Sequence, residues 1–328
     1  MAKILVIRFS ALGDVVMAVP VVQALAAQYP QHEICMLGKE SMAAYFQGLP
    51  QNVTFHGVNL QHYKGLAGLY RLYREMREYD YIADFHDVIR TKVLRLFFTL
   101  AGKRVRHIEK GRTQKQLLIQ QEDKRLVPLK STFQRYADVL EKLGFPVELA
   151  PTPATSCKYS QVKRIGIAPF AAHPGKVYPL EKMKEVVRAL AQWPDTQVYL
   201  YGGGEKEKAL LEQWEKEIPG IRSMVGKLSR DEELRHIAQL QVMVSMDSAN
   251  MHLASLVGTP VVSIWGATHP YAGFMGWGQD PENAVQVDDL PCRPCSIYGN
   301  KPCLHGDYPC LSRISPEQIL ERLEKVLK

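Results

Sequence analysis

An aspartate, a serine and a histidine follow a short apolar run late in the sequence. Asp247 and Ser248 come directly after the run 242–245, and His252 comes four residues after Ser248. The run has the length of a strand, and Asp and Ser are typical first residues of a helix because their side chains accept from its free N–H groups. At the carboxyl end of a parallel strand, these N–H groups and the helix dipole favour an anion. The pattern predicts an anion site, and a capped crossover helix with a surface histidine is the alternative.

Two further charged residues follow predicted strands. Asp14 lies in the turn after the strand 3–8, and Lys176 lies in the Pro/Gly-containing loop 170–178 after the strand 164–168. Loops at strand ends carry catalysis in α/β proteins. Asp14 is therefore a candidate general base, and Lys176 is a candidate to offset charge on a departing phosphate group. A helix cap and a solvated lysine are the simpler readings.

Glycines 202–204 precede Glu205 at the end of another predicted strand, 197–201. Glycines let a nucleotide approach the backbone closely, and a glutamate there accepts hydrogen bonds from ribose hydroxyls. A plain turn is the alternative.

Basic residues gather after the predicted strand 81–85. Asp84, His86, Arg90 and Lys92 lie at this strand end. A solvated helix face explains most of the basic residues that follow, but Arg90 and Lys92 are near enough to the strand end to bind an anionic substrate.

Four cysteines near the end of the chain have the spacing C-x2-C-x7-C-x6-C; they are Cys292, Cys295, Cys303 and Cys310. The first pair has the spacing of zinc ligands, whereas the second is wider than usual. We favour reduced cysteines packing an irregular loop, with a zinc site as the alternative and an iron–sulfur cluster as a weaker one.

The elements that position these residues form two α/β series. Each apolar run of strand length alternates with an amphipathic segment of helix length, which predicts parallel sheets covered on both faces. The expected strands are 3–8, 33–37, 53–58, 81–85, 105–108, 164–168, 197–201, 242–245 and 261–265. The expected helices are 15–28, 66–77, 90–100, 112–120, 133–143, 180–192, 206–217, 231–239, 250–256 and 316–327.

The length of 328 residues suits two domains better than one core. The segment 146–160 contains three prolines and small polar residues, which are typical of a linker. We therefore expect a first domain over 1–150, a linker over 151–163, and a second domain over 164–328.

The net charge of +7 is uneven along the chain. Residues 1–150 carry 21 Lys and Arg against 14 Asp and Glu, and the remaining residues carry 20 of each. This excess predicts an anionic partner for the first half: a phosphorylated substrate, an acidic lipid surface or a nucleic acid. A nucleic acid fits least, because the basic residues lack interleaved aromatic residues or a known binding pattern.

No apolar run reaches the length of a membrane span, and Arg8, Gly13 and Asp14 interrupt the apolar N-terminal stretch. Six cysteines without a secretory signal indicate a reducing compartment, so we expect a cytoplasmic protein without disulfides.

Taken together, these motifs resemble glycosyltransferase family 9, the lipopolysaccharide heptosyltransferases. The matches keep their order over nearly the whole chain: Arg8 to Val15 (R-x-x-x-hydrophobic-G-D), Lys176, Gly204-Glu205, Gly226 to Ser229, Asp247-Ser248 through His252-Leu253-Ala254 with Gly258-Thr259-Pro260, and Gly266 to Pro270. Two positions depart from the family pattern. Ala249 replaces the usual glycine, where its methyl group would crowd a diphosphate. Tyr178 stands where the family often has tryptophan, which keeps an aromatic ring for a sugar or base.

The resemblance implies a GT-B type fold. Two Rossmann-like parallel-sheet domains would face each other across a cleft, and the C-terminal helix would return towards the first domain. Reaction would take place in the cleft with inversion, without a required metal or cofactor. The substrate would be a nucleotide sugar, with ADP-heptose expected.

The resemblance also implies residue roles. The donor would be bound by Lys176, Glu205, Asp247, Ser248, Ala249 and His252. Asp14 would be the catalytic base, and Lys176 would also act in catalysis on the leaving diphosphate. The acceptor would contact Arg8, Ser10, Arg90 and Lys92. It would be an anionic glycolipid such as Kdo–lipid A, with the enzyme in peripheral contact with the cytoplasmic face of the inner membrane.

Three other functions remain open from the sequence. One is a glycosyltransferase using another nucleotide sugar and glycan, and another is a sugar-nucleotide epimerase of similar fold. The third is a catalytically silent nucleotide-binding homologue, which the Ala249 departure and the cysteine loop leave possible.

Overall fold

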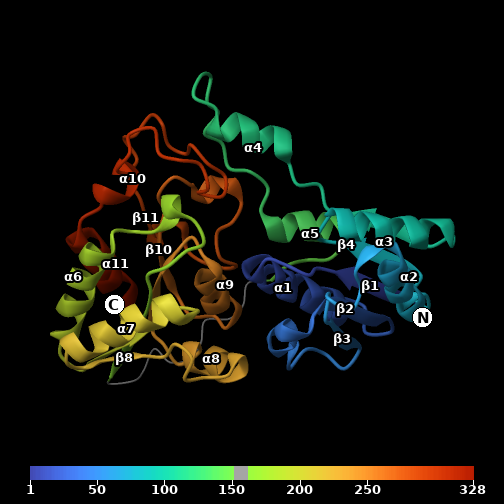
Figure 1. Cartoon of the computed structure of the whole chain (residues 1–328), viewed down its shortest axis with the longest axis horizontal. Helices are drawn as coiled ribbons and strands as arrows, with labels where there is room; N and C mark the ends of the chain where they lie inside the picture. Colours follow the sequence, from blue (N-terminus) through green and yellow to red (C-terminus); the bar gives the residue numbers. More distant parts are fainter. Residues whose placement is uncertain (151–161) are drawn as a thin grey trace. The chain divides into compact units, whose positions relative to one another are not determined.

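The computed structural model describes residues 1–150 and 162–328 of the chain (Figure 1). The chain divides into two compact units, described separately here. The first unit consists of Met1–Lys110 and Thr132–Pro151, and the second of Gly111–Ser131 and Thr152–Lys328. Most of the predicted linker, 151–161, lies outside the described residues.

The first unit contains a five-stranded parallel sheet in the order β3-β2-β1-β4-β5. Its central strand β1 reads KILVI, and four of these five residues are buried because helices cover both faces. The strands are β1 (Lys3–Ile7), β2 (Glu33–Lys39), β3 (Val53–Val58), β4 (Tyr81–Asp84) and β5 (Arg104–His107).

Four helices and a 3-10 helix accompany this sheet. They are α1 (Leu12–Gln28), the 3-10 helix Glu40–Phe46, α2 (Gly65–Met76), α3 (Ile89–Leu100) and α5 (Thr132–Glu141). Helix α1 packs against α5, and α2 packs against α3. Side chains of β1 alternate between the faces of the sheet, so Leu5 and Ile7 join the core with Leu72 of α2 and Phe98 of α3.

The second unit contains a six-stranded parallel sheet in the order β11-β10-β9-β6-β7-β8. The strands are β6 (Lys163–Ala168), β7 (Thr196–Leu200), β8 (Ile221–Ser223), β9 (Val242–Met246), β10 (Val261–Ile264) and β11 (Ala284–Val285). The helices are α4 (Arg112–Ile119), α6 (Leu180–Ala191), α7 (Glu205–Glu217), α8 (Arg230–Ile237), α9 (Ala249–Leu256), α10 (Pro309–Ser312) and α11 (Pro316–Leu327).

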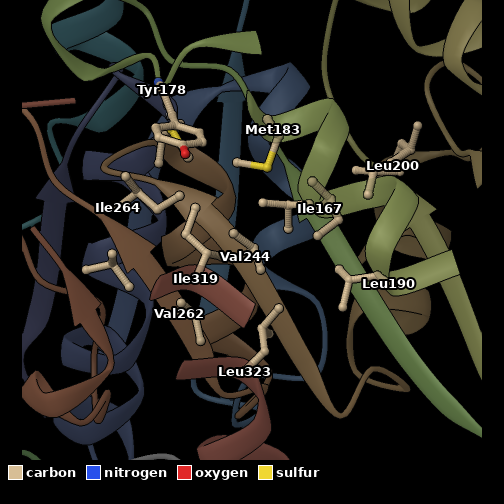
Figure 2. Packing of buried hydrophobic residues seen from close by; sticks show 14 of the residues in the cluster. Ile167, Tyr178, Met183, Leu190, Leu200, Val244, Val262, Ile264, Ile319 and Leu323 are labelled. Atoms are coloured by element: carbon tan, nitrogen blue, oxygen red, sulfur yellow. Dashed lines mark hydrogen bonds between the residues drawn. The ribbon is translucent and has the colours of Figure 1, made fainter. Parts of the chain in front are cut away.

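The C-terminal helix α11 packs within the second unit. Ser315 caps it and Pro316 occupies its first turn, as expected for a helix start. Its side chains Ile319 and Leu323 are fully buried, and Figure 2 shows them over Val244 and Val262 of the sheet. Helix α11 also contacts α6. Its contacts with β9, β10 and β11 lie within the second unit, and the expected return of this helix towards the first domain stays a prediction.

The segment 111–131, expected in the first domain, belongs to the second unit. The Leu129 N–H donates to the Tyr271 carbonyl at 2.8 Å, and the Lys124 ammonium donates to the Pro291 carbonyl at 2.9 Å. The Lys115 ammonium lies 4.5 Å from the centre of the Phe274 ring. These long-range contacts decide where the segment belongs, and no local sequence pattern encodes them.

This exchange redistributes the charge between the units. The segment 111–131 carries five Lys and Arg against two Asp and Glu, so the first unit has a net charge of +4 and the second of +3. The net positive charge is therefore shared almost equally by the two units. This corrects our expectation that it lies in the first domain alone.

In the described part of the chain, no helix combines the length and apolar character needed to cross a membrane.

Candidate functional site

Each sheet reverses its strand order at one point. In the first unit the chain runs outward from β1 to β3 and then returns to add β4 on the other side of β1. In the second unit it runs outward from β6 to β8 and then returns to add β9 beside β6. Ligands of open α/β sheets bind at the carboxyl ends of the two strands that flank such a point. The predicted site residues Asp14, Lys176 and Asp247 all follow these flanking strands.

In the first unit, Arg8 holds Asp14. The Arg8 guanidinium forms an ion pair with the Asp14 carboxylate and donates to the Phe85 carbonyl at 2.6 Å. Arg8 is buried at the end of β1, whereas the Asp14 side chain keeps 30% of its surface exposed. Asp14 also accepts from the Ala11 N–H at 3.3 Å across the first turn of α1. The carboxylate is thus oriented on one side and open to a substrate on the other.

A histidine that was not among our predicted site residues completes this cluster. The Ser10 hydroxyl and His86 Nε2 lie 3.3 Å apart, which joins the loops after β1 and β4. The buried Asp84 carboxylate shapes the second loop by accepting from the N–H groups of His86 at 2.9 Å and Asp87 at 3.0 Å. Position after a strand was a signal available in the sequence, but the contact with Ser10 depends on β1 and β4 being neighbours.

The predicted acceptor residues Arg90 and Lys92 separate in the structure. Arg90 is half-buried in the first turn of α3. Its positive charge, like that of Lys110, contributes to lowering the pKa of His86. Lys92 is exposed and lies about 200° further round the helix, so it points away from the face of Arg90. Lys110 donates to the Asp87 carbonyl at 2.9 Å and is a cation that the sequence analysis missed.

Burial, followed by the Arg8 guanidinium, lowers the pKa of His86 to about 4. The unfolded chain takes up a proton near the ordinary pKa of about 6.5, whereas the folded chain resists it until about 4. The contribution of neutral His86 to the free energy of unfolding is therefore complete above about pH 6.5 and falls by up to about 3 kcal/mol as the pH drops to about 4.

We expect His86→Asn to reduce the dependence of the unfolding free energy on pH between about 6.5 and 4, measured by urea unfolding. The exposed His62→Asn is the matched control, and a wild-type slope in the His86 variant would contradict the assignment.

In the second unit, Lys176 and Asp247 form a buried ion pair. Their Nζ and Oδ2 atoms are 2.8 Å apart, with 14% and 4% of the side chains exposed. Lys176 ends a 3-10 turn, Pro174–Lys176, after β6, and Asp247 follows β9. Asp247 thus fixes the ammonium group at the point where the strand order reverses.

The start of α9 lies directly after this pair. Ser248 is its N-cap residue but makes no side-chain cap hydrogen bond, and its hydroxyl lies 3.3 Å from that of Ser245. The first backbone N–H groups of α9 are therefore not used by the cap, which suits an anion. Ala249, at the first position of the helix, is partly exposed, whereas His252 is buried one turn further on.

The loop after β7 differs from the expectation in one detail. Glu205 is exposed at the first position of α7. Glu207 is the residue that holds the glycine loop, because its carboxylate accepts from the Gly203 N–H at 2.7 Å. A Cβ atom at Gly202 would lie 2.9 Å from this carboxylate and 3.2 Å from the Phe170 ring, so a larger residue there would displace the Glu207 side chain.

Tyr178 does not present its ring to a ligand. The side chain is fully buried, its hydroxyl donates to the Ile314 carbonyl at 3.0 Å, and Figure 2 shows it in the core of the second unit. The expectation of a sugar or base contact was wrong, because the ring fills space between the sheet and the C-terminal segment.

The cysteine loop, residues 292–310, is hydrogen-bonded to the backbone next to Lys176. The Gly175 N–H donates to the Gly299 carbonyl at 3.2 Å, and the Gly175 carbonyl accepts from Ala267 at 2.8 Å. Buried Arg293 secures the same region by donating to the carbonyls of Gly266 at 2.7 Å and Thr268 at 3.1 Å. The loop thereby joins the chain segments that follow β6 and β10.

A substitution at Gly299 tests whether the cysteine loop positions Lys176. A Cβ atom there would lie 2.6 Å from Lys176 Cγ, and its φ is +73°. We expect Gly299→Ala to displace Lys176 and weaken nucleotide binding by about tenfold, as a lost charged hydrogen bond does. Gly306→Ala is the matched control, because Gly306 has a φ of +84° but open space around it. Equal binding in the two variants, measured by calorimetry with ADP, would contradict this role.

The four cysteines line one small cavity of about 10 Å³. Burial raises the pKa of Cys310 to about 12 and also raises that of Cys295. Both are therefore thiols at neutral pH. Within residues 1–150 and 162–328, no group of three or more His, Cys, Asp or Glu side chains is arranged to hold a metal ion.

The two parallel-sheet units, each with charged residues at its reversal point, define a protein of the GT-B fold class. The solved structure of a glycosyltransferase family 9 protein from Veillonella parvula has this fold, with a TM-score of 0.74 and 18% identity over 99% of this chain and 97% of that one. Escherichia coli heptosyltransferase WaaC, solved with ADP, matches with a TM-score of 0.69 and 15% identity over 99% of both chains.

Sequence comparison is more specific. Residues 70–302 match the model of glycosyltransferase family 9 (heptosyltransferase). Lipooligosaccharide heptosyltransferase 2 of Campylobacter jejuni is 21% identical over 97% of this chain and 96% of its own length. The chain belongs to glycosyltransferase family 9, and it is a glycosyltransferase.

Proposed function

We propose that this protein is an inverting heptosyltransferase. It moves a heptose, or a related sugar, from an ADP-sugar to an anionic lipopolysaccharide core acceptor such as Kdo–lipid A. It works in the cytoplasm at the inner membrane and needs no metal. The family and the names of the relatives support the class of reaction.

One observation carries the donor assignment: the Lys176–Asp247 pair beside the start of α9, at the reversal point of the second sheet. The α9 N–H groups and the Lys176 ammonium are hydrogen-bond donors suited to a diphosphate. Asp247 holds Lys176 in place before the nucleotide arrives. Glu205 remains the candidate for the ribose, since it is exposed at the neighbouring strand end.

The acceptor is proposed to bind the first unit. Arg8, Ser10 and Arg90 lie around Asp14 and His86 at the reversal point of its sheet. Cations at this point suit an acceptor such as Kdo–lipid A, in which Kdo carries the carboxylates and lipid A carries the phosphates.

The reaction follows from these assignments. Asp14 removes the proton from the acceptor hydroxyl, and the oxygen attacks the anomeric carbon of the donor. The bond from that carbon to the diphosphate breaks, and the leaving group carries away the electron pair. Lys176 and the start of α9 stabilise the charge that develops on it. Asp14 keeps the proton until it is released to water.

Thermal unfolding with ADP, GDP, UDP and dTDP, each beside its monophosphate, tests the donor. A ligand at about 100 times its dissociation constant adds about 2.7 kcal/mol of stability. We expect ADP to raise the melting temperature most. A larger shift with UDP or GDP would favour another nucleotide sugar, and no shift with any of them would favour the silent homologue.

A further inference from the structure

Helices α2 and α3 expose a band of large apolar side chains. Leu66 is 69% exposed and Tyr70 is 46% exposed on α2. On α3, Ile89, Leu96 and Leu100 are 83%, 55% and 77% exposed. These five make up nearly half of the large hydrophobic side chains exposed in the described part of the chain. Soluble proteins rarely gather such side chains on one surface without a partner for it.

The α3 members form one stripe. Positions 89, 96 and 100 fall within about 40° of one another around an α-helix, and the stripe extends about 16 Å along its axis. The opposite face of α3, with Leu94 and Phe98, is buried in the core of the first unit. The helix therefore has an apolar side facing inward and a second one facing solvent, which core packing does not require.

Aromatic contacts make the two helices one surface. The rings of Tyr70 and Phe97 meet edge to face at 5.6 Å, and Tyr73 lies 5.8 Å from Phe97. Figure 1 shows α2 and α3 side by side. Tyr70 lies on the side of α2 that faces α3, because its ring contacts Phe97, and Leu66 lies on the same side because it precedes Tyr70 by about one turn and Tyr73 by about two. We call these five exposed side chains, with Phe97 and Tyr73 between them, the α2–α3 apolar band.

Cations flank the α2–α3 apolar band. Arg71 and Arg74 are exposed on α2, and Lys92 is exposed beside the stripe of α3. Helices α2 and α3 together carry five Lys and Arg against one glutamate. Arg95 is paired with Asp84 and Asp87 at 3.1 and 3.2 Å, so the exposed cations beside the band are Arg71, Arg74 and Lys92. An apolar stripe with flanking Lys and Arg is how a helix lies in the interface of an anionic bilayer.

We propose that the α2–α3 apolar band docks on an anionic lipid bilayer. The inference rests on the proposed function, because an acceptor anchored in lipid makes bilayer contact useful. Helix α3 begins at the candidate acceptor site, since only Asp87 and Val88 separate His86 from Ile89, the residue that opens both the helix and the stripe. The band thus holds the first unit where a glycolipid headgroup can reach that site while its acyl chains stay in the membrane.

Sedimentation with vesicles tests the proposal on the full chain. We expect wild-type protein to bind phosphatidylethanolamine vesicles containing phosphatidylglycerol, more tightly at low salt, and to bind phosphatidylcholine vesicles weakly. Leu96→Gln with Leu100→Gln should reduce the affinity about tenfold or more, since two apolar groups no longer insert. Leu126→Gln with Val127→Gln, exposed side chains of the second unit, is the matched control and should bind as wild type.

Other outcomes would overturn the proposal. They are a wild type that does not bind anionic vesicles, or a Leu96/Leu100 variant that binds as well as wild type. A wild-type dimer that this variant converts to a monomer, without vesicle binding by either, would assign the band to a second copy of the chain.

Activity separates this proposal from the proposed function. With a water-soluble, deacylated acceptor, the Leu96/Leu100 variant should turn over as wild type, whereas with acceptor in vesicles it should be about tenfold slower. Equal rates for the two proteins in vesicles would contradict the docking role. Vesicle binding that depends on the band, in a protein that transfers sugar to no acceptor, would support the docking surface while the proposed function fails.

Discussion

Replacing Asp14 with Asn should lower turnover by about 10²–10⁴-fold, the usual contribution of a general base. The amide has nearly the same shape but cannot take the proton of the acceptor hydroxyl. Affinity for ADP should stay within about twofold, because Asp14 belongs to the first unit and the proposed nucleotide site to the second. Turnover is measured as ADP release, and ADP affinity by calorimetry.

The Arg8–Asp14 ion pair requires a control, because the substitution also removes a charge beside a buried guanidinium. Asp138→Asn, on α5 of the same unit, removes a half-buried carboxylate outside the cluster and should retain wild-type turnover. Thermal unfolding of both variants reports any structural loss. A folded Asp14→Asn protein with wild-type turnover would exclude Asp14 as the base.

Replacing Lys176 with Met should have two effects. Affinity for ADP should fall by about 10- to 100-fold, the value of a charged hydrogen bond to phosphate. The protein should also lose about 3–5 kcal/mol of stability, because the Asp247 carboxylate remains buried without its cation. Calorimetry measures the first effect and urea unfolding the second.

A second substitution separates the two effects. Asp247→Asn added to Lys176→Met should recover much of the stability, because the uncompensated charge is gone. It should not recover ADP affinity, because the ammonium group is still missing. Recovery of both would mean that Lys176 serves only to neutralise Asp247, and unchanged ADP affinity in the single variant would remove Lys176 from the donor site.

Most elements of the fold could be predicted because their signals are local. The apolar runs 242–245 and 261–265 became strands β9 and β10, and Ser315-Pro316 marked the start of α11. Strands β8 and β11 were missed because three and two residues are too short to show a period.

The candidate site was predictable in part for the same reason. Asp14, Lys176 and Asp247 follow apolar strands, so their place at a sheet edge could be inferred from the sequence. The partners of these residues could not, because the Ser10–His86 contact and the Lys176–Asp247 pair require the strand order. Tyr178 had the right residue type for a ring contact, but its burial depends on the fold of the C-terminal segment.

The measurement that tests the central claim most directly is sugar transfer with stereochemistry. The protein is incubated with ADP-heptose and Kdo–lipid A, and the anomeric configuration of the product is read by NMR beside the release of ADP. We predict one ADP per sugar transferred, with the anomeric configuration inverted, and both signals slower by about 10²–10⁴-fold in Asp14→Asn. Transfer with retained configuration, or ADP-heptose left intact beside every lipopolysaccharide acceptor, would contradict the account.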